Sequence, residues 1–211
     1  MYRALMNTGG LFWSLTYILI IRRGFKDKTY GMPLAALCAN ISWEAIFSFI
    51  YPPSIPQLYI NYIWLFLDVF IVLQFLKFGK SEFQALSKKQ FYTMFLLVLA
   101  TCFGLVFSIS YEFSDWKGAY AAFGQNLMMS ILFIVMLFRR DDLRGQSIFI
   151  ALFKMIGTAL SSIAFYLYAS IAQGSVLLAF LFVSIFVYDL IYTVMVYQKY
   201  RENGISVWGR F

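Results

Sequence analysis

Residues 31–53 read GMPLAALCANISWEAIFSFIYPP, an apolar run that is ended by a pair of prolines. One carboxylate, Glu44, lies inside this run beside Trp43, and Asn40 lies four residues before it. A helix that crosses a bilayer core of about 30 Å needs about 20 apolar residues. The run therefore predicts a membrane-spanning helix with an acid inside the membrane. Acids in such positions are rare, and they need a partner or a function.

Six further apolar runs of similar length accompany this one along the 211 residues. Hydrophobic residues make up 62% of the chain and charged residues 13%, against about 25% charged residues in a typical soluble domain. The connections are short, so we expect an all-α, polytopic membrane protein whose seven transmembrane helices form one domain over residues 1–211. No small-residue cleavage site follows the first run, so it is not expected to be a signal peptide. The expected spans are 4–21, 31–51, 59–78, 89–110, 118–138, 147–170 and 175–198.

Basic residues gather in alternate connections between the expected helices. The net charge is +7, and the opposite connections carry only Arg3 and Lys117. Because positive loops face the cytoplasm, we predict an outside or lumenal N-terminus and a cytoplasmic C-terminus. The basic loops are expected to contact lipid headgroups and not nucleic acid. The expected location is the endoplasmic reticulum membrane in a eukaryote and the plasma membrane in a bacterium. The basic residues concerned are Arg22, Arg23, Lys26, Lys28, Lys77, Lys80, Lys88, Lys89, Arg139, Arg140, Arg144, Lys199, Arg201 and Arg210.

The first three and last three expected helices resemble each other weakly. Asp68 lies nine residues before Lys77, and Asp189 lies ten residues before Lys199. This weak similarity favours a 3+1+3 arrangement, in which the fourth helix links two groups of three helices. Small seven-helix transporters of sugar-like or other solutes share that layout, so a transporter is the alternative function. Proline hinges inside helices would support a transporter, but the prolines gather in one loop, with Pro33 at a helix start.

The sequence lacks the common patterns that bind metals or cofactors. It has no histidine, and Cys38 and Cys102 lie in apolar runs without a partner spacing. No Gly-rich phosphate loop is present. The pair Asp141-Asp142 lies among arginines in an expected loop, and we interpret it as a solvated charge cluster. We therefore predict no cofactor and no metal site.

Four ionisable residues lie inside the expected spans: Glu44, Asp68, Lys154 and Asp189. Each costs at least ~2.5–3.5 kcal/mol at the centre of a spanning helix, so each should be buried with partners. Lys154 either extends to the cytoplasmic surface or pairs with Asp189. Asp68 is either catalytic or a structural acid bonded to Tyr or Asn neighbours. The amides Asn61, Gln125 and Asn126 are either contacts between helices or groups that bind a ligand, and we place Asn126 in the candidate binding site.

Glu44 is the acid for which a catalytic role is most strongly indicated. At a rise of ~1.5 Å per residue it lies deep in its span, and no cation in the spans reaches that depth. A carboxyl group without water or a cation stays protonated, and it can then act as a general acid. Asn40, one turn earlier, can orient the carboxyl group. Aromatic faces stabilise cations, and those of Trp43, Phe47, Trp64 and Tyr188 are expected to line a water-poor cavity. Protonation of a hydrophobic polyene suits such a site.

The segment RRGFKDKTYGMPLAALCANISWEAIFSFIYPP, residues 22–53, resembles the second-helix region of a known enzyme family. That family is the membrane-bound terpene cyclases of fungal meroterpenoid and indole-diterpene pathways, which have bacterial relatives. The likeness covers essentially the whole chain. It includes the seven spans, the Asn-x-x-Trp-Glu element at Asn40–Glu44, an acid in the last helix (Asp189), and the C-terminal SVWGRF segment.

The resemblance implies an enzyme that cyclises a prenyl chain, often with a terminal epoxide, attached to an aromatic or indole group. Protonation starts this reaction, without loss of diphosphate. The resemblance also implies that Glu44 and Asp189 are the essential acids. Our reading of the residues agrees on Glu44, with Asp189 in support, either as a relay of protons or as the acceptor of the final proton.

Overall fold

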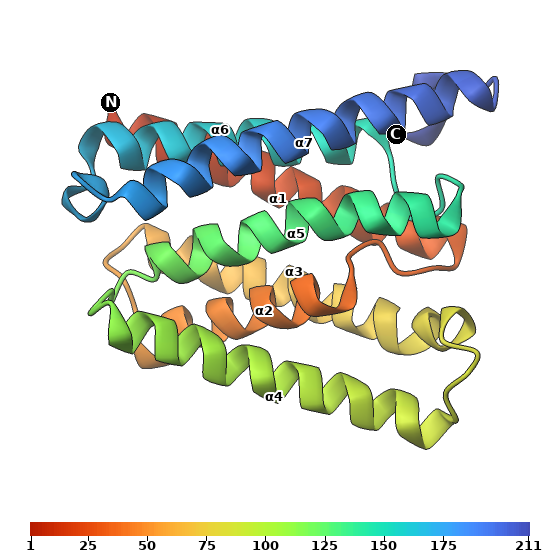
Figure 1. The fold of residues 1–211 in the computed structure, drawn as a ribbon, viewed down its shortest axis with the longest axis horizontal. Helices are drawn as coiled ribbons and strands as arrows, with labels where there is room; N and C mark the ends of the chain where they lie inside the picture. Colours follow the sequence, from red (N-terminus) through yellow and green to blue (C-terminus); the bar gives the residue numbers. More distant parts are fainter.

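A computed structural model describes residues 1–211, which form helices and no strand (Figure 1). Seven α-helices follow one another, with a π-helical turn after α2 and short 3₁₀ segments elsewhere. The α-helices are α1 (Tyr2–Asp27), α2 (Leu34–Ala45), α3 (Gln57–Phe78), α4 (Lys88–Glu112), α5 (Ala119–Arg140), α6 (Ile148–Tyr168) and α7 (Val176–Glu202). The short segments are η1 (Ile46–Ile50), η2 (Gly79–Glu82), η3 (Ser170–Ala172) and η4 (Val207–Arg210).

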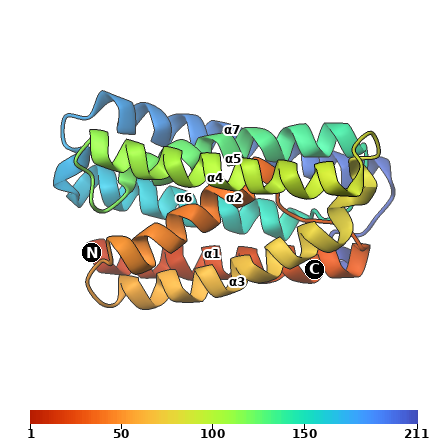
Figure 2. The ribbon, with the colours of Figure 1, turned by 90° about the horizontal axis from the view of Figure 1, so that it is seen from below.

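The helices run in alternating directions, so their connections lie at two ends of one bundle. The N-terminus and the connections before α3, α5 and α7 share one end, which we call the N-terminal end (Figure 1). Helix α1 packs most extensively against α6, and α2 lies inside the bundle against α3, α4 and α5 (Figure 2). The central position of α2 carries Glu44 into the interior. The expected 3+1+3 arrangement and the orientation in the membrane remain predictions.

Six of the α-helices are long and apolar enough to cross a membrane. The second expected span, 31–51, is shorter in the structure than predicted, because α2 and η1 together cover only Leu34–Ile50. Pro33 precedes the first helical residue, and Tyr51 and the prolines after it end the segment. Proline lacks the N–H group that a helix interior requires. The predicted all-α fold is confirmed, and its six long apolar helices are consistent with the predicted multi-pass membrane protein. The expected second span forms a shorter apolar helix.

The longer helices also extend beyond their predicted spans. Arg22, Arg23 and Lys26 belong to α1, although the sequence placed them in a connection. Lys77 likewise lies in the last turn of α3, and Arg139 in that of α5. Continuing the helix satisfies the backbone hydrogen bonds of these residues, and a cation near a helix C-terminus is favourable. The apolar run in the sequence marks the part of the helix in the bilayer core, and the helix itself continues beyond that run.

The predicted loop charges form exposed ion pairs. Asp141 accepts a hydrogen bond from Lys199 at 2.6 Å, and Asp142 accepts one from Arg144 at 2.6 Å. The Lys199 ammonium ion lowers the pKa of the Asp141 carboxyl group below its ordinary value. These contacts match the interpretation of Asp141-Asp142 as a solvated charge cluster.

Two glycines allow α1 and α6 to approach closely. A Cβ atom at Gly9 would lie 3.0 Å from the Gly157 carbonyl oxygen, and one at Gly157 would lie 3.1 Å from the Gly9 carbonyl oxygen. Small residues at helix crossings bring backbones together in membranes, where lipid gives no hydrophobic drive for association. This crossing fixes the position of Trp13, one turn along α1, against α6.

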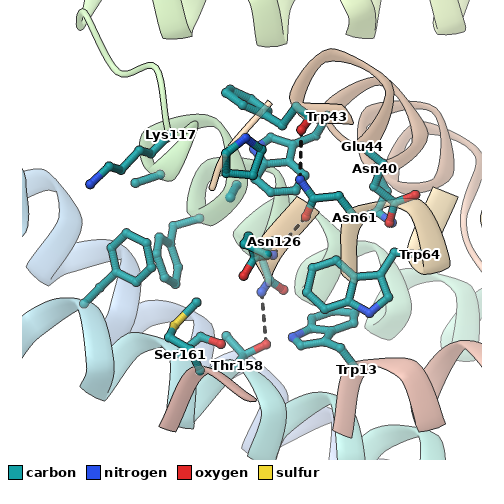
Figure 3. A pocket seen from close by; sticks show the side chains of 18 of the residues that line it. Trp13, Asn40, Trp43, Glu44, Asn61, Trp64, Lys117, Asn126, Thr158 and Ser161 are labelled. Carbon is teal, nitrogen blue, oxygen red and sulfur yellow. Dashed lines mark hydrogen bonds between the residues drawn. The ribbon is translucent and has the colours of Figure 1, made fainter. Parts of the chain in front are cut away.

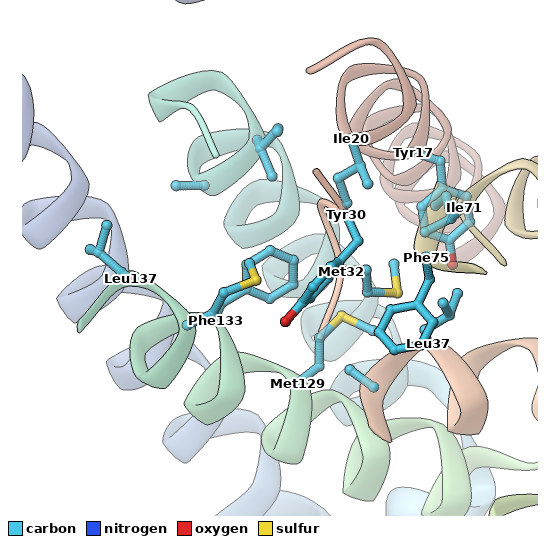
Figure 4. Packing of buried hydrophobic residues seen from close by; sticks show 14 of the residues in the cluster. Tyr17, Ile20, Tyr30, Met32, Leu37, Ile71, Phe75, Met129, Phe133 and Leu137 are labelled. Carbon is cyan, nitrogen blue, oxygen red and sulfur yellow. The ribbon is translucent and has the colours of Figure 1, made fainter. Parts of the chain in front are cut away.

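The largest hydrophobic cluster lies toward the end opposite the N-terminal end (Figure 4). Tyr30, Met32, Phe75 and Phe133 are buried within it, and the Tyr30 and Phe75 rings meet edge to face with centroids 5.0 Å apart. Its side chains come from all seven α-helices and from the α1–α2 and α5–α6 connections. The cluster fills the interior of this half of the bundle with side chains.

Large apolar side chains cover the outer faces of the bundle. Leu97 of α4, Phe66 of α3 and Val183 of α7 are between 63% and 66% exposed. Contiguous apolar surface of this kind marks contact with a membrane or a partner. On helices of this length, it is the surface that lipid chains would cover.

Candidate active site

A cavity of about 540 Å³ lies between the helices, and its lining extends from Arg3 and Lys117 at the N-terminal end to Met129 of α5. Figure 3 shows side chains that line it. Its walls come from α1, α2, α3, α5 and α6, and its mouth includes Arg3, Pro53 and Lys117. Sites for small molecules usually measure about 300–1,000 Å³, with mostly apolar walls and few polar groups. The cavity falls in this size range, and its walls combine aromatic rings with a larger share of polar side chains than usual. Six predicted site residues line it: Asn40, Trp43, Glu44, Phe47, Trp64 and Asn126.

Glu44 is the acid that faces this cavity. It is 1% exposed, and its Oε1 atom accepts hydrogen bonds from the Tyr17 hydroxyl at 3.0 Å and from Asn40 Nδ2 at 3.1 Å. The predicted contact between Asn40 and Glu44, one turn apart on α2, is thus present. Its Oε2 atom has no hydrogen-bond partner. One carboxyl oxygen is held by two donors, whereas the other is buried and receives no hydrogen bond from a donor group. The Glu44 and Asp68 carboxyl groups lie within hydrogen-bond reach of each other.

Asp68 lies behind Glu44, outside the cavity lining. It is fully buried, and its Oδ2 atom accepts a hydrogen bond from Asn40 Nδ2 at 2.8 Å, whereas Oδ1 has no partner. The Asn40 amide nitrogen therefore connects both carboxyl groups, and it also contacts the Tyr17 oxygen at 2.5 Å. This arrangement fits the alternative in which Asp68 is bonded to an Asn neighbour. It also brings two predicted acids together.

No cation compensates these two carboxyl groups, since neither Glu44 nor Asp68 takes part in any ion pair of the structure. An uncompensated ion buried in protein costs several kcal/mol, and two neighbouring carboxylates also repel each other. The arrangement therefore favours protonated carboxyl groups, and at most one shared negative charge. Because Glu44 lines the cavity, a protonated Glu44 is the candidate proton donor of this site.

Aromatic rings surround the cavity on the side of Glu44. The Trp43 and Phe47 ring centroids are 4.9 Å apart, and those of Tyr17 and Trp64 are 6.3 Å apart. Trp43 Nε1 donates to the Gly118 carbonyl oxygen at 2.9 Å, and Trp64 Nε1 donates to Ser14 Oγ at 3.0 Å. The indole N–H groups are thus satisfied by the protein, and the rings form walls that can stabilise a cation by ~0.5–2 kcal/mol each.

The π-helical turn η1 shapes the wall just after Glu44. The Tyr51 N–H group bonds to the Ile46 carbonyl, five residues back, and the Phe47 carbonyl accepts a hydrogen bond from Asn61 Nδ2 at 3.0 Å. Such turns often occur at functional sites because they change the direction of side chains. Asn61 is thus a contact between helices, as one alternative predicted, and it holds the segment that carries Phe47.

Asp189 belongs to a separate network that lies on the α6 and α7 side of the cavity. It is 1% exposed, and its Oδ1 atom is 2.6 Å from Lys154 Nζ. Lys154 is also 1% exposed, so its alternative extension to the cytoplasmic surface is wrong and its pairing with Asp189 is present. Neither residue lines the cavity, but Lys154 Nζ donates to Asn126 Oδ1 at 3.1 Å.

Tyr188 lies outside the site. Its side chain is 37% exposed on the outer face of α7, and it does not line the cavity. Consecutive helical residues point about 100° apart, so the inward direction of Asp189 turns Tyr188 toward the outside. The prediction that Tyr188 lines a cavity is therefore corrected by the geometry of the helix.

Tyr17 is the site residue that the sequence reasoning missed. It is buried, it donates to Glu44, and it lies on α1, far from α2 in the sequence. The sequence did contain one signal, since Tyr17 lies inside an apolar run, one turn after Trp13. In the structure the two rings meet with centroids 5.7 Å apart. A tyrosine hydroxyl well inside a span needs a partner, and the acids of the other spans were candidates.

Comparisons with known proteins identify relatives of this chain. A family model that describes Pyr4-like transmembrane terpene cyclases matches residues 1–203. The chain is 30% identical over 169 residues to the Pyr4-family terpene cyclase mfmH of Annulohypoxylon moriforme, with 76% of this chain and 68% of that protein covered. It is 28% identical to the terpene cyclase macJ of Penicillium terrestre, with 74% and 63% covered. The matched part thus spans about two thirds of these relatives. No solved structure matches the chain.

Proposed function

We propose, on the premise that this chain belongs to the family of Pyr4-like transmembrane terpene cyclases, that it cyclises a prenylated substrate by protonation from Glu44. The substrate class is a hydrophobic prenyl chain attached to an aromatic or indole group, as in meroterpenoids or indole-diterpenoids. The single observation that carries the proposal is the Glu44 carboxyl group, which lines the cavity and has no cation to compensate it. Membership of this family does not favour the transporter alternative.

The first step transfers a proton from Glu44 Oε2 to an epoxide oxygen or an olefin carbon of the prenyl chain. Tyr17 and Asn40 both donate to Oε1, so they favour the proton on Oε2. As the proton leaves, the same two donors stabilise the growing carboxylate charge. Donors fixed in place before the reaction act in this way without reorganisation. After this transfer Glu44 is a carboxylate and Asp68 is still protonated, so the two carboxyl groups together carry one negative charge.

Opening of the protonated epoxide breaks a C–O bond and leaves a tertiary carbocation. The double bonds of the folded chain then attack in sequence, and each attack closes a ring and moves the positive charge along the chain. The rings of Trp43, Phe47 and Trp64 line the cavity and can stabilise this charge. Loss of one proton from carbon to the Glu44–Asp68 pair, which carries one negative charge after the first step, ends the sequence and restores the acid. One proton enters and one leaves, so product and substrate are isomers, and no step requires a metal or a cofactor.

Product analysis tests this proposal. Membranes that contain the chain are supplied with an epoxidised farnesyl-arene, and with the geranylgeranyl analogue in a second arm. The proposal predicts a cyclised isomer of unchanged mass, identified by chromatography and NMR, that is absent from membranes without the chain. Transport of the substrate into sealed vesicles without any isomer would favour the transporter alternative and reject the enzyme.

A further inference from the structure

A buried ammonium ion stands directly behind the cavity wall. Lys154 Nζ is within hydrogen-bond distance of three acceptors: Asp189 Oδ1 at 2.6 Å, Ser130 Oγ at 2.7 Å and Asn126 Oδ1 at 3.1 Å. An ammonium group has three hydrogens to donate, so this cage matches the charged form fully. The side chain is 1% exposed, and water does not screen its charge.

Two of its neighbours face the cavity. Asn126 and Trp13 both line the cavity, and Lys154 Nζ lies 5.8 Å from the centroid of the Trp13 ring. A positive charge in this position repels any cation that forms in the cavity, and it competes for the π-face of Trp13. An enzyme that works through carbocations has to cancel this charge.

Asp189 is the group that can cancel it. Its Oδ1 atom contacts the ammonium ion, and its Oδ2 atom has no partner. No hydrogen bond connects Asp189 to Glu44, Asp68, Asn40 or Tyr17. We propose that Asp189 is the counter-ion of Lys154, and that this ion pair is a positioning device for the cavity wall which keeps the wall neutral toward carbocations. On this proposal Asp189 does not carry protons.

The pair also fixes the direction of the Asn126 amide. Because Lys154 donates to Asn126 Oδ1, the amide NH₂ group points toward Thr158 and donates to its Oγ1 atom at 3.0 Å. Thr158 also lines the cavity. Its hydroxyl oxygen is thus an acceptor for Asn126, and its hydrogen remains available to donate. The amide and hydroxyl dipoles of this wall are set by a charge that the substrate does not touch.

Charge removal distinguishes a counter-ion from a proton carrier. Asp189→Asn leaves Lys154 uncompensated, so we expect kcat to fall by about tenfold or more with KM nearly unchanged, since the charge acts only once the substrate becomes cationic. The double variant Lys154→Met/Asp189→Asn has a neutral pair, and we expect its kcat to lie within about tenfold of the wild type, because interacting sites are not additive. A proton carrier would leave the double variant as inactive as Asp189→Asn.

The comparison of the double variant with the wild type decides the question even if Asp189→Asn alone does not accumulate. A double variant that accumulates normally and makes no cyclised product overturns the inference. Removal of the exposed pair by Lys199→Met/Asp141→Asn is the matched control, and it should leave kcat and KM unchanged. The inference rests on the proposed function, so Glu44→Gln is assayed beside these variants. If Glu44→Gln is active, the proposed function is rejected. If Glu44→Gln and the double variant are both inactive, only the counter-ion role of Asp189 is rejected.

Infrared spectroscopy adds a readout that needs no substrate. The difference between wild-type and Asp189→Asn membranes near neutral pH should contain the bands of an ionised carboxylate at Asp189. A lost band of a protonated carboxylic acid would instead show that Asp189 is neutral and would overturn the ion pair.

Discussion

Gln125 and Asn126 are consecutive residues of α5, and each amide joins a different buried network. Gln125 Nε2 donates to Asn40 Oδ1 at 3.5 Å, in the network of Glu44 and Asp68. Asn126 Oδ1 accepts from Lys154 at 3.1 Å, in the network of Asp189. Both amides line the cavity. The two acids that the family resemblance singles out, Glu44 and Asp189, therefore stand in different electrostatic surroundings, one without a cation and one paired with a cation.

Tyr17→Phe removes one of the two donors to Glu44 Oε1 and keeps the aromatic ring. A hydrogen bond to a charged group is worth about 1.5–3 kcal/mol, so we expect kcat to fall about 10- to 100-fold. Abundance in the membrane should not change, since the ring still packs against Trp13 and Trp64. The control is Tyr188→Phe on the lipid-facing side of α7, for which turnover equal to wild type is expected. Full activity of Tyr17→Phe would remove this donor from the mechanism.

Gly118→Ala should distort the cavity wall. Gly118 has φ +69°, and a Cβ atom there would lie 2.3 Å from Phe47 Cε2 and 2.6 Å from Trp43 Nε1. Strain of the backbone and these overlaps together predict destabilisation by about 1–3 kcal/mol, measured as a lower melting temperature in detergent. Gly104→Ala on α4 is the control, because no atom lies within 4 Å of the added Cβ atom. Equal melting temperatures of the two variants would contradict the predicted overlap.

The orientation in the membrane is a prediction that cysteine labelling can test. Both native cysteines are buried, so labelling of a single introduced cysteine shows on which side of the membrane that residue lies. Lys88→Cys, at the start of α4, should react only with a reagent that reaches the cytoplasmic face. Lys117→Cys, at the mouth of the cavity, should react from the outside or the lumen. The reverse pattern would invert the topology and place the mouth of the cavity toward the cytoplasm.

Turnover should not depend on a divalent metal, because Glu44 supplies the proton in the proposed first step. Assays in EDTA and in added Mg²⁺ should therefore give the same rate of product formation. Loss of activity in EDTA that Mg²⁺ restores would require a Lewis acid and would contradict the mechanism.

The sequence predicts the contacts within one helix better than those between helices. Asn40 and Glu44 stand one turn apart, so their hydrogen bond follows from the 3.6-residue period of α2. Tyr17, the partner of Glu44, and Lys154, the partner of Asp189, lie on other helices than the acids they contact. The depth of Lys154 in its span was compatible both with extension to the surface and with pairing to Asp189. Which α1 residue meets Glu44 depends on how α1 crosses the bundle, and close contact at Gly9 and Gly157 determines that crossing.

Helix ends were also less predictable than helix identities. Hydropathy identifies the apolar core of each span, but hydrogen bonding continues the helix beyond it, as at Arg22 and Lys26 of α1. The direction of Tyr188 is a third case. Its aromatic character suggested a cavity wall, but the burial of Asp189 next to it turns the ring outward.

The rate of cyclisation by Glu44→Gln tests the central claim most directly. Glutamine keeps the size of the side chain and can accept the hydrogen bonds of Tyr17 and Asn40, but it cannot supply the proton. General acid catalysis is typically worth about 10²–10⁴-fold, so we predict a folded, membrane-inserted variant with almost no cyclised product, beside a fully active Glu112→Gln control at the exposed end of α4. If Glu44→Gln formed product at more than about a tenth of the wild-type rate, a loss below the range for general acids, Glu44 would be a structural residue and the proposed mechanism would be wrong.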